Sequence, residues 1–289
     1  MDLNSLTAIS PIDGRYRQKV NELDLYFSEF GLIKYRLMVE VEYFIALCNI
    51  PLPPLSDFRK ENFKILRSVF EDFSLSDAEK VKEKEKVTNH DVKSVEYFLK
   101  EKFLDSGWQK WSEFIHFGLT SQDINNTAIP LALKDALINV YFPLLYDVRD
   151  TLANLADDWK EIPMLARTHG QPASPTRLGK EISVFVARID EQSKYFGQIP
   201  YSAKFGGATG NFNAHKAAYP DIDWISFADT FVNSELGLQR SHPTTQIEHY
   251  DNLAALFDNM RRINTILIDL SRDIWTYISM DYFRQKIRK

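Results

Sequence analysis

The part of this sequence best suited to chemistry is the segment RTHGQPASPT, residues 167–176, which lies between two long helical patterns. A connecting turn needs residues such as Gly170, but it does not need imidazole, hydroxyl and amide side chains side by side. His169 can exchange a proton near neutral pH, and Thr168 and Gln171 can hydrogen-bond carboxylate or amide groups. We therefore interpret His169 as a candidate acid–base residue, with Thr168 and Gln171 as supporting residues.

A second polar segment, LTSQDINN at 119–126, opens the longest helical pattern. Thr120 or Ser121 fits the N-cap of that helix, and Asp123 fits the third position of a capping box. One interpretation is that these residues only cap the helix. The other is that the free N–H groups and two hydroxyls at the helix start bind a carboxylate or phosphate, and the local pattern leaves both open.

The segment TNHDVK at 88–93 has the same form. Asn89 or Asp91 is the predicted cap of the helix that follows, and His90 lies in its first turn. A histidine in such a polar loop, taken alone, is more often structural than functional.

Two further polar segments are KFGGATGNFNAH at 204–215 and HPTTQIEHYD at 242–251. The first lacks the Gly-Lys-Ser/Thr ending and the preceding strand of a nucleotide-binding loop, so its glycines are expected to permit close backbone approach instead. The second is predicted to open the last helix, with Thr244 or Thr245 as cap and Gln246 in the first turn. No Cys/His constellation predicts a metal site.

Apolar residues recur at helical spacing along nearly the whole chain, so the sequence predicts an all-α fold whose helices position these segments. Three long apolar stripes, at 133–155, 178–199 and 246–289, imply a bundle of long helices. Pro130 and Pro143 are expected to kink or split the helix that carries the first stripe.

The first 110 residues carry shorter helical patterns, at about 22–48, 57–72, 77–86 and 91–104. We predict a small N-terminal helical domain over residues 1–110 and a long-helix bundle domain over residues 111–289. Alternating patterns typical of strands are hard to find.

Composition excludes several classes of protein. A net charge of −5 argues against nucleic-acid or membrane-surface binding. The single cysteine, Cys48, excludes an internal disulfide framework and fits a reducing, cytoplasmic location. The first residues do not look like a signal peptide, and no run approaches the roughly 18 uninterrupted apolar residues of a membrane span.

Taken together, the polar segments resemble the motifs of the fumarase/aspartase superfamily, in the order usual for it. The matching segments are SPIDGRY at 10–16, TNHDVKSVEYFLKEK at 88–102, EFIHFGLTSQDINN at 113–126, RTHGQPASPT at 167–176, GATGNFNAH at 207–215 and TTQIEHYD at 244–251. The first, second and last of these narrow the resemblance to the branch that acts on purine nucleotides.

The resemblance implies an enzyme that eliminates fumarate by general acid–base catalysis, without a metal or organic cofactor. Its substrates would be adenylosuccinate, which gives AMP, and the succinylated carboxamide ribotide of purine synthesis. It also implies a cytoplasmic homotetramer in which helices of four subunits form one central bundle and three subunits contribute to each active site. The expected partner is thus a small nucleotide, not a nucleic acid or a membrane.

The resemblance assigns roles to individual residues. His169 falls at the position of the general acid that protonates the leaving nitrogen, and Thr120 and Ser121 fall where the family binds the succinyl group. Its other substrate-binding positions correspond to Arg15, Tyr16, Asn89, His90, Asp91 and Gln246, and Asn211 corresponds to a supporting position. His90 has the alternative role of assisting His169 or binding phosphate.

One family feature is missing from this sequence. The third signature, a Gly-Ser-Ser-x-x-Met-Pro-x-Lys-x-Asn loop that carries the serine base, does not occur in it. We therefore expect a fragment that lacks the base, the rest of the bundle and the C-terminal domain, with little turnover of its own. A chain shortened in evolution, with the fold but without turnover, is the alternative.

Two other functions remain as hypotheses. Another lyase of the superfamily, such as argininosuccinate lyase or fumarase, would keep the mechanism and change the substrate. A catalytically silent helical protein would act through its bundle surface and would bind no purine nucleotide.

Overall fold

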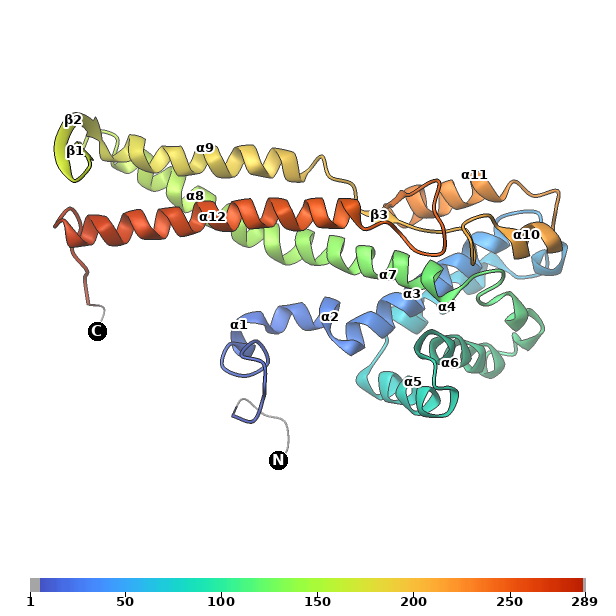
Figure 1. Ribbon diagram of the computed structural model, residues 1–289. Coiled ribbons are helices and arrows are strands. Elements are labelled where there is room, and N and C mark those ends of the chain that lie inside the picture. The colour runs from blue at the N-terminus through green and yellow to red at the C-terminus, as the bar shows by residue number, and fades with distance from the viewer. Residues whose placement is uncertain (1–5, 288–289) are drawn as a thin grey trace. The chain divides into compact units, whose positions relative to one another are not determined.

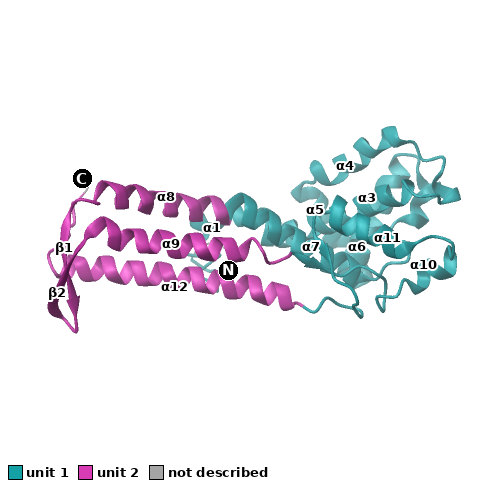
Figure 2. Cartoon of the chain, turned by 90° about the horizontal axis from the view of Figure 1, so that it is seen from above, with its two compact units in different colours: residues 1–140, 201–249 teal, residues 141–200, 250–289 magenta. Residues whose placement is uncertain are grey.

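The computed structural model describes residues 6–287 of the chain as two compact units, coloured separately in Figure 2. Unit 1 comprises the residues up to 140 together with 201–249, and unit 2 comprises 141–200 together with the residues from 250 onward. The expected boundary near residue 110 lies inside unit 1, because the helix that begins at Ser121 packs on the core helix of that unit.

Unit 1 is mostly helical, as predicted (Figure 1). Its α-helices are α1 (Arg17–Val20), α2 (Asp24–Phe27), α3 (Glu29–Cys48), α4 (Phe63–Glu71), α5 (Leu75–Thr88), α6 (Asp91–Asp105), α7 (Ser121–Ala136), α10 (Asn213–Ala218) and α11 (Trp224–Asp229). Short helical turns are η1 (Asn21–Leu23), η2 (Pro53–Leu55), η3 (Lys60–Asn62), η4 (Gln109–Phe114) and the π-helical η6 (Thr230–Glu235). Strands β3 (Ser202–Ala203) and β4 (Gln239–Arg240) pair in parallel.

The core of unit 1 is built around α3, which packs against α4, α6 and α7. Most residues of α3 from Ile33 to Leu47 are buried, which is typical of a helix inside a core. Phe44, for example, makes edge-to-face contacts with Phe58 and Phe103. Elements that touch α3 are therefore held by the largest apolar cluster of the unit.

Unit 2 consists of α8 (Phe142–Asp158), α9 (Leu178–Phe196), α12 (Asp251–Ser279) and a hairpin of β1 (Pro163–Thr168) and β2 (Gln171–Arg177). The three helices run alongside one another, and the hairpin lies at one end of the bundle (Figures 1 and 2). The predicted apolar face of α9 is confirmed, because Ile182, Phe185, Ile189 and Phe196 are all buried.

The first apolar stripe is not broken at its prolines. Pro130 lies inside α7, and Pro143 is the second residue of α8, where its missing N–H is tolerated. Between the two helices, the π-helical segment η5 (Leu137–Tyr141) absorbs the disturbance. Of the predicted kink or split, the split is wrong: helical backbone continues from Ser121 to Asp158, with the π-helical segment just before Pro143.

This helical run is also the one candidate membrane span among residues 6–287, judged by length and composition alone. Its most apolar window is partly buried, and the interior helix of a soluble protein passes the same test. Leu131, Ala132 and Ala136 of α7 are buried in this structure, which fits a core helix.

The segment 167–176 is a hairpin, not the loop between helices that the sequence analysis expected. β1 and β2 pair antiparallel from Pro163↔Arg177 to Thr168↔Gln171, with an irregularity between Leu165 and Arg167. The prolines of this segment hid the strands from sequence analysis. A two-stranded ribbon tolerates proline because both of its strands are edges.

The last helix is shorter than predicted at both ends. Residues 244–250 form a loop, and α12 begins at Asp251 because Tyr250 has a left-handed backbone with φ +65°. At the other end the helix stops at Ser279, and Asp281 has φ +60°. The predicted helix is therefore wrong over residues 246–250 and 280–287, residues 288–289 lie outside the described part of the chain, and Gln246 lies in a loop instead of a first helical turn.

Gly179 lets α9 begin directly against the end of α8, since a Cβ at this position would lie 2.2 Å from the carbonyl oxygen of Ala156. We expect Gly179→Ala to lower the free energy of unfolding by about 1–3 kcal/mol through overpacking. Gly197→Ala is the matched control, because its Cβ would meet nothing closer than 3.7 Å. Urea unfolding of both variants checks this, and equal stabilities would contradict it.

Candidate active site

The candidate site in unit 1 depends on three polar residues on one face of the core helix α3. Arg36, Glu40 and Tyr43 are spaced four and three residues apart, so they share a face. Arg36 is 5% exposed, and Glu40 and Tyr43 are 0% exposed. Because unpaired buried polar groups are costly, this α3 polar stripe must find partners, and its partners belong to the motif segments.

Arg36 connects the starts of α6 and α7. Its Nη2 donates to Asp91 Oδ2 at 2.5 Å, and its Nε donates to Asn125 Oδ1 at 2.9 Å. Burial alone would raise the pKa of Asp91, but the guanidinium of Arg36 and the backbone N–H of Val92 hold that pKa below its usual value. Sequence analysis missed Arg36, although a charged residue inside an apolar helix was a usable signal.

His90, not Asn89 or Asp91, caps α6. Its Nδ1 accepts a hydrogen bond from the backbone N–H of Lys93 at 3.2 Å, while Asn89 ends α5 with φ +50°. The predicted caps are thus wrong, since the left-handed Asn89 turns the chain and places the imidazole over the helix start.

The same imidazole brings two motif segments together. His90 Nε2 lies 3.3 Å from Ser121 Oγ, at the start of α7. Because Nδ1 accepts from Lys93, a neutral His90 carries its proton on Nε2 and donates to the Ser121 hydroxyl. This contact joins the predicted TNHD and TSQD sites.

A cleft of about 510 Å³ opens beside His90. It is lined by Glu29, Leu32, Arg36, Lys82, Glu85, Asn89, His90 and Asp91. The lining mixes cationic and anionic groups, so it can bind a ligand that carries both donors and acceptors.

The start of α7 is fixed by Asp123. Thr120 is the N-cap, as predicted, and its N–H donates to Asp123 Oδ2 at 2.8 Å. Asp123 Oδ1 accepts from Lys204 Nζ at 2.7 Å and from the N–H groups of Gly206 and Gly207 at 2.9 and 3.1 Å. The close backbone approach expected of the glycines is confirmed, because Gly206 and Gly207 lie against the Asp123 carboxylate at the start of α7.

The turn that leads into α7 is held by the rest of the α3 polar stripe. Glu40 Oε1 lies 2.5 Å from Nδ1 of His116, whose φ is +58°. Burial disfavours the imidazolium, but the charge of Glu40 and the hydrogen bond to it raise the pKa of His116 above its ordinary value. Tyr43 donates to the carbonyl of Phe117 at 2.7 Å.

His215 is the fully buried partner of Tyr43. Its Nε2 lies 2.9 Å from the Tyr43 hydroxyl, which already donates to Phe117, so Nε2 carries the proton. Burial lowers the pKa of His215 to about 4. The ring leaves no room for a side chain at Gly118, where a Cβ would lie 2.7 Å from it.

Gln246 and Asn211 are exposed side chains on neighbouring loops of unit 1. The loops touch at Gly210, where a Cβ would lie 2.4 Å from the carbonyl oxygen of Thr244. The Gln246 loop is also tied to α7, because Glu248 N–H donates to Asn126 Oδ1 at 2.9 Å. Neither Thr244 nor Thr245 caps a helix, contrary to prediction, since the helix begins later.

Arg15 and Tyr16 lie in the segment before α1, and the guanidinium of Arg15 is 5.6 Å from the centre of the Tyr16 ring. Both side chains are exposed. Their predicted role in substrate binding therefore rests on the sequence motif alone.

His169 belongs to unit 2, where it forms the tip of the β1–β2 hairpin with Gly170. Their φ angles of +48° and +76° are those of a two-residue type I′ turn. Arg167 Nη1 donates to the carbonyl of Gly170 at 3.1 Å, and Thr168 pairs with Gln171 across the turn. All of these side chains are exposed, so His169 is presented at the surface of its unit.

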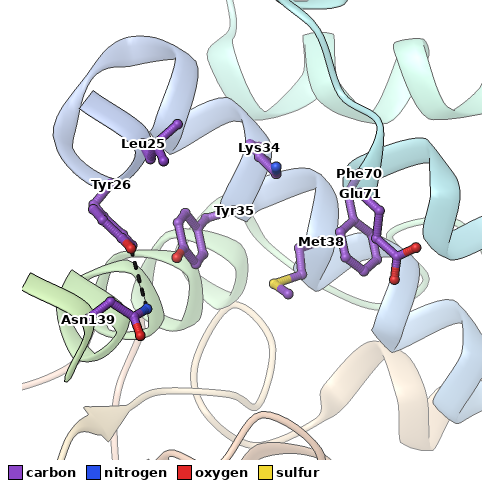
Figure 3. Close-up of a pocket in the computed structure, with 8 residues that line it drawn as sticks. All are labelled: Leu25, Tyr26, Lys34, Tyr35, Met38, Phe70, Glu71 and Asn139. Atoms are coloured by element: carbon purple, nitrogen blue, oxygen red, sulfur yellow. Dashed lines mark hydrogen bonds between the residues drawn. The ribbon is translucent and has the colours of Figure 1, made fainter. Parts of the chain in front are cut away.

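Another pocket, of about 390 Å³, lies in unit 1 beside α2, α3 and α4 (Figure 3). Its lining includes Tyr26, Tyr35, Met38 and Phe70, and Asn139 donates to the Tyr26 hydroxyl across it. None of the predicted site residues lines this pocket. Within residues 6–287, no three His, Cys, Asp or Glu side chains converge as a metal-binding group.

The motifs and the fold agree with comparisons to known proteins. A family model described as Lyase matches residues 14–289. The chain therefore belongs to this family, which is part of the fumarase/aspartase superfamily.

Within the family, the chain is similar to adenylosuccinate lyases. It is 56% identical over 296 residues to the enzyme of Dictyostelium discoideum, covering 100% of this chain and 64% of that protein. It is 46% identical over 288 residues to the enzyme of Escherichia coli strain K12, covering 99% of this chain and 63% of that protein. The chain thus spans less than two thirds of the length of either relative.

Solved structures confirm the fold. A fumarate lyase from Mesorhizobium sp. BNC1 superposes with a TM-score of 0.71 at 21% identity, over 90% of this chain and 57% of that one. The 3-carboxy-cis,cis-muconate lactonizing enzyme from Pseudomonas putida superposes with a TM-score of 0.69 at 19% identity. The superposition covers 90% of this chain and 56% of that enzyme.

The fully buried His215 and the partly buried His116 respond to pH in opposite directions. The depressed pKa of His215 means that the unfolded chain takes up a proton near pH 6.5 and the folded chain only near pH 4, so folding stability falls by up to about 3 kcal/mol over this interval. His116, with its raised pKa, stabilises the fold below pH 6.5, and this contribution is lost as pH rises through the raised value.

Urea unfolding of the unmodified protein and of His215→Asn between pH 7 and pH 4 measures the first effect. We expect the loss of stability on acidification to be smaller in the variant, which has no imidazole to protonate. Parallel curves for the two proteins would show that His215 is not held neutral.

Proposed function

We propose that this chain is part of an adenylosuccinate lyase of purine nucleotide synthesis. The enzyme would release fumarate from adenylosuccinate, giving AMP, and from the succinylated carboxamide ribotide on the route to IMP. The observation that carries the proposal is the match of the whole chain to adenylosuccinate lyases at 56% identity. The side chains of the matching motifs supply chemistry that suits this reaction.

His169 is proposed as the general acid. When the carbon–nitrogen bond breaks, the departing nitrogen needs a proton, and an imidazole can supply it near neutral pH. Two features support the assignment: the ring is exposed, and a tight turn holds the backbone around it. Thr168 and Gln171 are proposed to support it.

Thr120 and Ser121 are proposed to bind the succinyl group. Removal of a proton next to a carboxylate drives negative charge onto that carboxylate, which then needs preorganised donors. The start of α7 offers hydroxyl and N–H groups at the positive end of a helix dipole. Asp123 holds this start in place through Thr120 and the glycine-rich segment.

The nucleotide is proposed to contact Asn89, His90 and Asp91 beside the cleft, and Arg15 and Tyr16. Gln246 is proposed as a further substrate ligand, with Asn211 in support. His90 Nδ1 is occupied by the backbone N–H of Lys93, which leaves Nε2 as the ring atom that faces Ser121, and this geometry favours a binding role over proton transfer.

The base is not assigned to any residue of this chain. The superfamily's serine loop is absent from the 289 residues, so we propose that a longer form of the protein supplies it. The same form is proposed to be a cytoplasmic homotetramer, to need no cofactor and to bind neither nucleic acid nor membranes. The 289-residue chain alone is then expected to turn over several orders of magnitude more slowly.

His169→Asn tests the acid in the full encoded protein, because asparagine also accepts the left-handed backbone of this turn. We expect kcat for fumarate release to fall by about 10²–10⁴-fold, with substrate affinity changed far less. His249→Asn is the control, since His249 is an exposed loop histidine with no assigned role. Unchanged turnover in His169→Asn would remove the assignment.

A substrate panel tests the reaction itself. Fumarate release should be seen with adenylosuccinate and not with argininosuccinate or malate. Activity on either of these would point to another lyase of the superfamily. A protein that binds neither adenylosuccinate nor AMP by calorimetry would instead be the silent helical protein.

A further inference from the structure

Arg36 has no explanation in stability alone. It lies in the middle of a core helix and is 5% exposed. Removing a charged side chain from water is costly, and a well-packed apolar residue in place of a buried ion pair is often as stabilising or more so. The position of this guanidinium is better understood from what it holds together.

The guanidinium uses two different nitrogens for two different elements. Nη2 reaches Asp91, the first residue of α6, and Nε reaches Asn125 on α7. Because the guanidinium is planar and rigid, the two hydrogen bonds fix the two acceptors at one separation. A single ammonium group could not impose the same geometry.

Each acceptor lies next to a residue of the proposed substrate site. Asp91 directly follows His90, which caps α6. Asn125 lies four residues after Ser121, and residues with this spacing share a helix face. The His90–Ser121 contact of 3.3 Å is thus supported on both sides by the same guanidinium.

We infer that Arg36 is a positioning residue that sets the separation of the α6 and α7 starts, and with it the register of His90 against Ser121. The inference rests on the proposed function insofar as these two residues bind substrate. Arg36 also lines the cleft beside His90, but its guanidinium is engaged by Asp91 and Asn125, so it acts on substrate through the residues that it positions. Its effect is therefore predicted in the geometry of the empty site as well as in turnover.

Arg67 provides a matched control. It donates through Nε and Nη2 to both carboxylate oxygens of Glu42, at 2.7 and 2.8 Å, and so links α4 to α3 by a comparable two-bond pair. Neither residue belongs to a motif segment. Loss of this pair should affect stability without reaching the proposed substrate site.

The experiment compares Arg36→Met, Arg36→Lys and Arg67→Met in the full encoded protein. Arg36→Met should fold, since the side chain of Asp91 is 45% exposed and water can solvate its carboxylate. We expect kcat/KM to fall by about 10²-fold in Arg36→Met, as for a misplaced binding group, and to fall in Arg36→Lys too. Arg67→Met should keep kcat/KM unchanged, and its thermal unfolding temperature should fall only slightly, because the Arg67 side chain is 41% exposed.

Two measurements without substrate separate this inference from the proposed function. The ¹⁵N NMR signals of His90 should report one Nε2-protonated ring in the unmodified protein and in Arg67→Met, and a mixture of ring tautomers in both Arg36 variants. Exchange of the Lys93 amide, which donates to His90, should be faster only in the Arg36 variants.

Full activity in Arg36→Lys would show that charge matters and the two-nitrogen bridge does not, which would overturn the inference. An unchanged His90 signal and Lys93 exchange in Arg36→Met would overturn it as well. If the unmodified protein releases no fumarate, the proposed function fails, and these two measurements still decide whether Arg36 positions His90.

Discussion

The candidate site of unit 1 depends on one constraint, which is that polar groups inside an apolar helix must be paired. Arg36, Glu40 and Tyr43 are buried on a single face of α3, and water cannot satisfy them there. Arg36 pairs with Asp91 and Asn125, Glu40 Oε1 pairs with His116, and Tyr43 donates to the carbonyl of Phe117. Within the described residues, the second oxygen of Glu40 has no hydrogen-bond partner. The core helix thereby fixes the loops and helix starts that carry the motifs. The contacts that satisfy the polar groups of α3 therefore also set the geometry of the candidate site.

The same region shows how tightly the backbone is constrained. The turn before α7 has left-handed residues at His116 and Gly118, a conformation that non-glycine residues adopt only at some cost. Two imidazoles hold this turn: His116, whose pKa is raised by its contact with Glu40, and His215, whose ring lies against Gly118 and whose pKa is lowered by burial. Asp123 then fixes the end of the turn by accepting from the N–H of Thr120.

Unit 2 holds the imidazole of His169 at its surface. Its three helices supply a long apolar scaffold, and the hairpin at one end closes on two residues with positive φ. Tyr282, just beyond α12, donates to the carbonyl of Leu165 at 3.0 Å and ties the hairpin to the end of that helix. Short strands that could not be stable alone are in this way anchored to a rigid bundle.

Sequence alone determined the helical class, the positions of most helices and the identity of the polar segments. Apolar residues at helical spacing are a local signal, and ordered motifs are specific even without coordinates. α9, the cap at Thr120 and the close approach of Gly206 and Gly207 followed from these signals.

Tertiary structure decided what local signals do not encode. The hairpin around His169 was hidden because proline weakens any strand pattern, and the true start of α12 depends on the single left-handed residue Tyr250. The roles of Arg36 and Lys204 could not be read from spacing, since their partners lie 55 to 89 and 81 residues away in the chain. Which buried charge meets which carboxylate is fixed only when the helices pack, because pairing depends on distance in space and not on distance in sequence.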